Sequence, residues 1–270
     1  MGWGAPAATG TPLNDSRCTL ESEGIALRDS SGDDWRWSAP RPTGTAWTFR
    51  TAGNAGVWSW DDGAPDPRLL LPVRRPRSGA LSRHIPVRAF SMTTGAHIAL
   101  ESGLEHDLLR LLDRDGDASW LVPQPCRVEW PLDGRTKGHV PDLLTADRAG
   151  AVTVWDVKSP DRAHSPAFAA VAELSSDACR EVGWAYRVFT GLTPVHRHNL
   201  LWLHGHRHNP AGNPHLEAEV LQECASGAVL GAVLGASSPE RRAVVWHHVW
   251  TGKIRVDLSQ PLTAATLVVA

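Results

Sequence analysis

Two charged residues in the middle of the chain have the types and spacing needed for metal-assisted hydrolysis. Asp156 and Lys158 lie at the end of the apolar segment 151–158, which has the composition of a central strand covered on both faces. Side chains alternate along a strand, so these two project from the same face, about 7 Å apart. Charges at the end of a buried strand are costly unless they are paired or bind a metal. Taken alone, the pattern is also typical of a structural ion pair.

A second carboxylate makes the nuclease interpretation stronger. Pro141-Asp142 begins another apolar segment, and a turn between the two segments would bring Asp142 beside Asp156. Pro-Asp also occurs wherever a turn leads into a strand. Together these residues spell the PD-(D/E)xK nuclease signature. Two carboxylates would hold Mg²⁺, with Mn²⁺ able to replace it, and Lys158 would orient or help to deprotonate the attacking water. So short a motif often arises by chance.

Glu105 is the candidate for a third acidic ligand. It lies in a helix expected over residues 102–113, whose leucines recur at helical spacing. The segment from Ser102 to Glu105 also has the form of a capping box, which requires no catalysis. The two roles compete for one side chain, and Glu101 is the alternative ligand. The backbone carbonyl of Val157 is a further possible ligand.

Charge and lysine usage give two further constraints. The net charge of −2 and the lack of a dense basic run weigh against a chain that grips DNA unaided. Arginine supplies nearly all positive charge, since only three of the 27 basic residues are lysines: Lys137, Lys158 and Lys253. A lysine in such a chain is expected where a compact ammonium is required.

The pattern along the chain predicts three parts. Residues 1–88 form a Gly-, Pro- and Trp-rich extension with short strand-like pieces such as 46–50, and their role is unknown. Residues 89–208 have the pattern of a mixed α/β domain. Residues 209–270 begin with a linker and continue with three short helices and a strand-like segment at 254–258, the order of a winged helix. The elements expected between these boundaries are strands at 119–122, 126–130, 142–145, 152–158 and 184–189, and helices at 166–182, 196–204, 215–224, 228–234 and from 238 onward.

Several other features favour an ordinary cytoplasmic protein. No apolar run is long enough for a transmembrane helix, and the first residues lack the pattern of a signal peptide. The four cysteines are scattered, which argues against a thiolate zinc site or a disulfide framework. Five histidines at positions 196, 198, 204, 206 and 208 lack the accompanying ligands of a known zinc motif.

From Ser102 to the C-terminus the sequence resembles the TnsA family, the endonuclease subunits of heteromeric transposases. The matching pieces occur in order: SGLEHDLLRLLDRD, QP, HVPDLL, WDVKSP, GWAYRV and a C-terminal HHVWTGKIRVDLSQPLTAATLV. The resemblance implies a restriction-endonuclease-like mixed sheet flanked by helices, followed by a winged helix. It also implies that Glu105, Asp142 and Asp156 bind metal and that Lys158 is the catalytic lysine. Some members carry glutamine in place of Asp156, so the aspartate favours activity.

The expected function is therefore metal-dependent phosphodiester hydrolysis at transposon ends, within a complex that contains an integrase-like transposase and an ATPase regulator. Two alternatives stay open. The chain could be a non-catalytic scaffold of such a complex, although Asp142, Asp156 and Lys158 are all intact. It could also be a stand-alone restriction or repair endonuclease.

Overall fold

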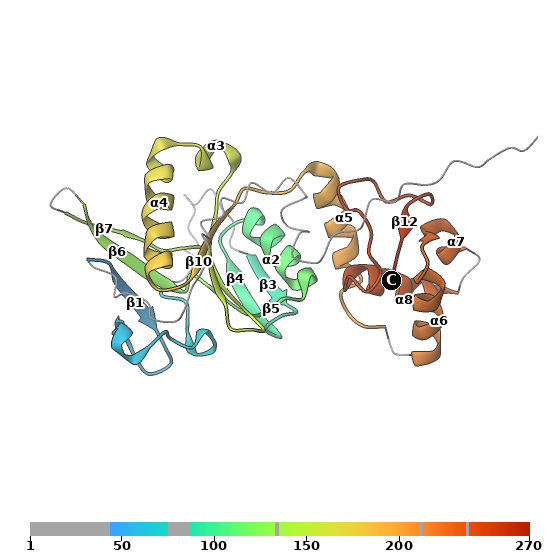
Figure 1. Ribbon diagram of the computed structural model, residues 1–270, viewed down its shortest axis with the longest axis horizontal. Helices are drawn as coiled ribbons and strands as arrows, with labels where there is room; N and C mark the ends of the chain where they lie inside the picture. The colour runs from blue at the N-terminus through green and yellow to red at the C-terminus, as the bar shows by residue number, and fades with distance from the viewer. Residues whose placement is uncertain (1–43, 75–86, 133–134, 211–212, 236–237) are drawn as a thin grey trace, which may run out of the picture.

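The computed structural model describes residues 44–74, 87–132, 135–210, 213–235 and 238–270. These residues form a mixed α/β structure, which confirms the class predicted from the sequence (Figure 1). The central sheet has the strand order β10-β9-β8-β5. Its strands are β5 (Ala118–Pro123), β8 (Leu143–Asp147), β9 (Val152–Val157) and β10 (Ala185–Phe189). β8 is antiparallel to both β5 and β9, whereas β10 is parallel to β9.

Helices connect and cover these strands. The helix expected before the sheet is α2 (Gly103–Asp115), and the crossover from β9 to β10 contains α3 (Pro160–Ala163) and α4 (Pro166–Glu181). A parallel neighbour requires such a crossover. α5 (Pro194–His204) follows β10. Each of α2, α4 and α5 begins after a serine or threonine whose hydroxyl accepts the hydrogen bond of an N-terminal amide.

A second sheet lies against the first and includes part of the predicted extension. Its strand order is β2-β1-β6-β7, and its strands are β1 (Ala46–Arg50), β2 (Ala55–Val57), β6 (Cys126–Leu132) and β7 (Arg135–His139). Trp47 and Phe49 of β1 are buried and contact Trp184, which precedes β10. Residues 44–74, with the short 3-10 helices Trp60–Asp62 and Pro67–Leu69, are thus packed into the α/β body. Residues 1–43 of the extension lie outside the described residues.

Two elements near α2 were not expected from the sequence. β3 (Val87–Ser91) and β4 (Ala96–Leu100) form a separate antiparallel hairpin. The carboxylate of Asp113 in α2 accepts hydrogen bonds from the hydroxyls and amides of the turn between them, at 2.7 to 3.0 Å. This one acid fixes the hairpin to the end of the helix.

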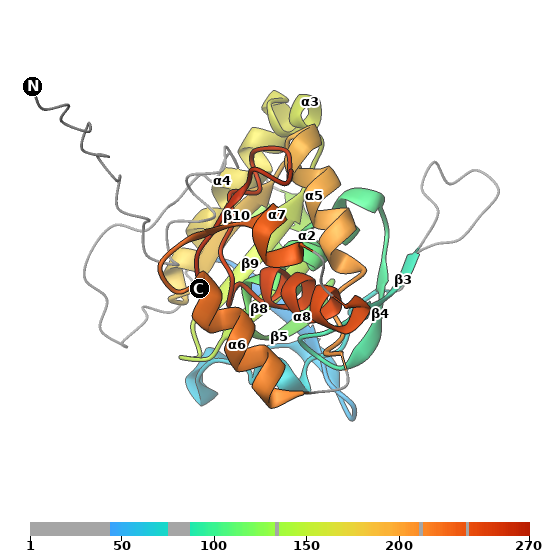
Figure 2. The ribbon, with the colours of Figure 1, turned by 90° about the vertical axis from the view of Figure 1, so that its right-hand side faces the viewer.

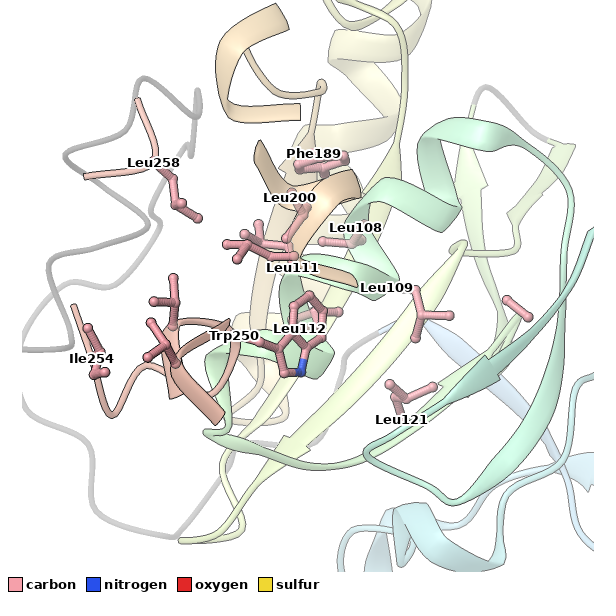
Figure 3. Packing of buried hydrophobic residues seen from close by; sticks show 14 of the residues in the cluster. Leu108, Leu109, Leu111, Leu112, Leu121, Phe189, Leu200, Trp250, Ile254 and Leu258 are labelled. Atoms are coloured by element: carbon pink, nitrogen blue, oxygen red, sulfur yellow. The ribbon is translucent and has the colours of Figure 1, made fainter. Parts of the chain in front are cut away.

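One hydrophobic core joins the central sheet to the C-terminal helices (Figure 3). Leucines of α2, among them Leu108 and Leu111, share it with Phe189 and Leu200, and Trp250 and Leu258 reach it from the C-terminal region. The C-terminal elements are α6 (Pro214–Cys224), β11 (Ala228–Val229), α7 (Leu230–Leu234), α8 (Pro239–Trp250) and β12 (Leu267–Val268). These elements lie in front of the α/β body when the molecule is viewed from its C-terminal side (Figure 2).

The strand expected at 254–258 is not formed. Only Arg255 makes a bridge, to Val269, while β11 pairs with β12. Asp257 explains the difference, because its carboxylate accepts hydrogen bonds from the amide and the hydroxyl of Ser259 and turns the chain. Ile254 and Leu258 on either side of it are fully buried. The strand predicted for residues 254–258 was therefore wrong.

Among the described helices, none combines the length and the apolar character that a bilayer span requires. The three described cysteines, Cys126, Cys179 and Cys224, are free and buried.

Asn199 links α5 to the C-terminal region and provides a test of this packing. Its buried amide donates to the carbonyls of Leu258 and Gln260, at 2.9 and 2.8 Å. Asn199→Ala would leave two carbonyls without this donor, which costs about 1–3 kcal/mol. We predict a lower urea midpoint for this variant, whereas Asn209→Ala, at an exposed position, should match the wild type. Equal midpoints for all three proteins would show that the link contributes nothing to stability.

Candidate active site

The strand pairing of β8 and β9 brings the two predicted aspartates together. Leu143 lies opposite Trp155, and the amide of Asp142 donates to the carbonyl of Trp155 at 3.0 Å. Continuing this register by one residue places Asp142 opposite Asp156. Both side chains are buried, with 9% and 0% of the residue exposed. The turn between the two apolar segments therefore produces the juxtaposition expected from the sequence.

The ammonium of Lys158 lies where three oxygens converge. Its Nζ atom is 2.7 Å from Oδ2 of Asp142, 3.4 Å from Oδ1 of Asp156 and 3.1 Å from the carbonyl oxygen of Val157. The backbone amide of Lys158 donates to Phe189 of β10, which fixes the end of the strand. Phe168, in the first turn of α4, presents its ring 5.4 Å from the ammonium. The site is thus built from the ends of three adjacent strands and the start of one helix.

These contacts determine which groups carry charge. Burial lowers the pKa of Lys158, but the negative charges of Asp156 and Asp142 outweigh burial and leave it above its ordinary value. Lys158 is therefore a fixed cation at neutral pH. Burial raises the pKa of Asp142, although Lys158 and the amide of Val157 both donate hydrogen bonds to it at 2.7 Å.

Asp156 has two further partners that sequence reasoning missed. Nε2 of His139 lies 2.9 and 2.8 Å from its two carboxylate oxygens, and the hydroxyl of Tyr186 donates to Oδ2 at 2.6 Å. An ionised carboxylate only accepts hydrogen bonds, so Nε2 of His139 carries the proton. Burial raises the pKa of Asp156, but the bond and charge of His139 and the charge of Lys158 outweigh it and hold the pKa at about 2.

His139 and Tyr186 could not be assigned to the site from the sequence because both reach it through strand pairing. Arg135–His139 reads as a polar loop and forms strand β7 only because it pairs with β6. Tyr186, the one tyrosine of the chain, is opposite Val154 in the parallel pair of β10 and β9. Tyr186 lies near Asp156 because β10 pairs in parallel with β9 after a long crossover, and the register of that pair cannot be predicted from the local sequence.

Glu105 occupies the capping position and also lies within electrostatic range of the site. Its amide donates to the hydroxyl of Ser102, while its own carboxylate accepts from that hydroxyl and from the amide of Glu101, both at 2.8 Å. Burial and the charge of Asp142 raise its pKa to about 7, against the bonds from Glu101 and Ser102. The alternative ligand, Glu101, pairs instead with Arg74 at 2.9 Å. The capping role of Glu105 is thus present, and no direct contact with either aspartate is formed.

Gln124 directly follows β5, contacts the backbone of Asp142 and has a strained backbone. Its φ angle is +47°, a conformation uncommon for a residue other than glycine. Its amide donates to the carbonyl of Asp142 at 3.0 Å. The side chain is 1% exposed and makes no hydrogen bond with a residue that the structure describes. Strain of this kind persists where the surroundings impose it, often at functional positions.

The oxygens around Lys158 are the donors that a hard divalent cation prefers. Two carboxylates and a backbone carbonyl meet at one point, which matches the ligand types of Mg²⁺ or Mn²⁺. In the described part of the chain, however, no set of three His, Cys, Asp or Glu side chains is arranged to hold a metal ion. Glu105 is engaged in its cap, and the five histidines noted in the sequence do not gather. The two aspartates and the Val157 carbonyl thus supply donor types that suit a divalent cation, without a third acidic or imidazole ligand among the described residues.

Neither a scan of protein-family models nor a search of curated proteins found a match to the chain.

Glu105 makes the stability of the metal-free protein depend on pH. Its carboxyl titrates near pH 4.5 when unfolded and near pH 7 when folded, so its contribution is present below pH 4.5 and is lost as the pH rises through 7. Glu105→Gln cannot ionise. We predict that the variant gains up to about 3 kcal/mol over wild type between pH 4.5 and 8, measured by urea unfolding in a chelator.

Exposed Glu173 in α4 provides the matched control, because Glu173→Gln removes the same charge outside the site. Its stability should follow wild type at every pH. If the Glu105→Gln curve also runs parallel to wild type, the carboxyl of Glu105 is not held in a charge-excluding environment.

Proposed function

We propose that the protein is a metal-dependent DNA endonuclease with a restriction-endonuclease-like core. The observation that carries this proposal is the convergence of the Asp142 and Asp156 carboxylates and the Val157 carbonyl around one cation, the ammonium of Lys158. An acidic pair at strand ends next to a lysine is the arrangement that the PD-(D/E)xK signature requires. The central mixed sheet, with α2 and α4 beside it, is consistent with this fold.

Each residue has a role that follows from its surroundings. Asp142, Asp156 and the carbonyl of Val157 would hold Mg²⁺, or Mn²⁺ in its place. A cation held there would polarise the scissile phosphate and activate the attacking water. Lys158 keeps its proton because two carboxylates raise its pKa, which favours a role in positioning the nucleophile and stabilising negative charge over one as a base. Glu105 would not hold the metal directly; its carboxyl would interact electrostatically with that of Asp142.

The narrower proposal, an endonuclease subunit of a heteromeric transposase, rests on the ordered sequence motifs shared with the TnsA family. In that setting the substrate is DNA at transposon ends, and the partners are an integrase-like transposase and an ATPase regulator. The order α6, β11, α7, α8, the bridge at Arg255 and then β12 supports a winged-helix interpretation of the C-terminal region. This region would contact DNA or a partner subunit.

One observation favours a non-catalytic scaffold as the second candidate. Both carboxylate oxygens of Asp156 already accept hydrogen bonds, from His139 and Tyr186. A carboxylate held in this way can serve as a purely structural centre. The presence of a lysine at position 158, in a chain that uses arginine for most of its positive charges, weighs against this candidate.

Substitution of Lys158 tests the catalytic proposal. We predict that Lys158→Met lowers the single-turnover rate of duplex cleavage in Mg²⁺ or Mn²⁺ by about 10²–10³-fold, as loss of a transition-state donor does. Lys158→Arg should not restore the rate, because a guanidinium is larger and planar and cannot take the place of a compact ammonium. The assay uses the full chain in excess over end-labelled duplex.

The control is Lys253→Met, which removes another of the three lysines at an exposed position after α8. Its cleavage rate should equal that of wild type. Cutting of the duplex by Lys158→Met at the wild-type rate would contradict the catalytic proposal and favour the scaffold.

A further inference from the structure

Strand β7 carries three basic residues in line with the candidate active site. Arg135, Lys137 and His139 alternate along it, so they project from one face with successive residues about 7 Å apart. The direction of this face is fixed by His139, whose ring contacts Asp156. The register agrees, because His139 lies opposite Val128 and Lys137 opposite Trp130, two buried residues.

The charges on this face have no protein partner among the described residues. Arg135 and Lys137 are exposed, and neither makes an ion pair with a residue that the structure describes. On the opposite face, by contrast, Arg127 pairs with Glu129 at 2.9 Å. That pair lies over Gly138, where a Cβ atom would come within 2.7 Å of the Arg127 guanidinium. The hairpin therefore has one neutralised face and one face with two available cations.

The position of the hairpin leaves this face accessible to a large partner. β7 is the last strand of its sheet, and among the described strands it pairs with β6 alone. The β6–β7 hairpin extends from the α/β body at the end of the molecule opposite the C-terminal helices (Figure 1). Basic residues on an edge strand can also serve only to prevent pairing with another chain. That role requires no alignment with a site, whereas here the third member of the row contacts the Asp156 carboxylate.

We infer that the Arg135–Lys137 face of β7 binds the phosphate backbone of duplex DNA and leads it to the site at Asp156. Two cations in a row match a ligand whose negative charges repeat along a line. Duplex DNA is chosen over a small anion because the row is extended and open rather than enclosed. The inference rests on the proposed nuclease function and assigns to it the surface that positions the substrate. It also explains how a chain with a net charge of −2 binds DNA locally.

The test is the affinity of the full chain for a labelled duplex in EDTA, where cleavage cannot occur, over a series of salt concentrations. Arg135→Gln and Lys137→Gln should each weaken binding and reduce the slope of log K against log salt by about 0.9, the value for one lost phosphate contact. The matched control is Arg148→Gln. This exposed residue lies in the turn between β8 and β9, at the opposite end of those strands from Asp142 and Asp156, and its loss should leave the slope unchanged. Circular dichroism melts verify that every variant is folded.

The outcomes separate this inference from the nuclease proposal. Reduced slopes for the two β7 variants support a DNA-binding face even if the wild type does not cleave, in which case only the proposed function fails. Wild-type slopes in both variants, or no binding of duplex by the wild type, overturn the inference. Self-association of the variants with unchanged DNA affinity also overturns it, since the cations would then protect the strand edge.

Discussion

The site depends on one electrostatic constraint: a cation must lie between the buried carboxylates of Asp142 and Asp156. Two carboxylates on adjacent buried strands repel each other, and neither is accessible to enough water for solvation. Lys158 resolves this by placing its ammonium against both of them and the Val157 carbonyl. The same geometry assembles oxygens of the kind that a divalent cation prefers. Under the proposed function, the structural and the catalytic role would be two states of one arrangement, in which the ammonium and a metal ion would compete for the same oxygens.

The surrounding elements maintain this constraint. β8 and β9 set the two acids opposite each other, and β10 holds the strand end through Phe189. The Asp156 carboxylate is held in place and kept ionised by hydrogen bonds with Tyr186 and with His139, which lies on β7 of the second sheet. The second sheet is thus required by the site as well as by the core. Since β1 is an inner strand of that sheet, part of the N-terminal region that looked peripheral in the sequence supports the geometry of the site.

The sequence predicted the helices and strands that follow from local residue patterns, and it missed strands that form only by pairing with distant segments. Leucine periodicity identified α2, and two apolar segments joined by a turn identified β8, β9 and the proximity of Asp142 to Asp156. Strand β7 was missed because its residues are polar or small, so that only its pairing with β6 makes it a strand. The β3–β4 hairpin was also missed, although its strands include Phe90 and Ile98. The segment 254–258 has the apolar alternation of a strand, but the Asp257 turn redirects it. The competition at Glu105 was visible in the Ser102–Glu105 spacing, and the structure shows the cap.

Thermal melting with increasing Mn²⁺ or Mg²⁺ tests whether the oxygens around Lys158 form a cation site. A ligand that binds only the folded state raises the melting temperature as its concentration passes Kd. We predict that the metal stabilises the wild type, fails to stabilise Asp142→Ala, and stabilises Lys158→Met at least as strongly as wild type, because the competing ammonium is gone. No response in the wild type at millimolar metal, or an equal response in Asp142→Ala, would contradict it.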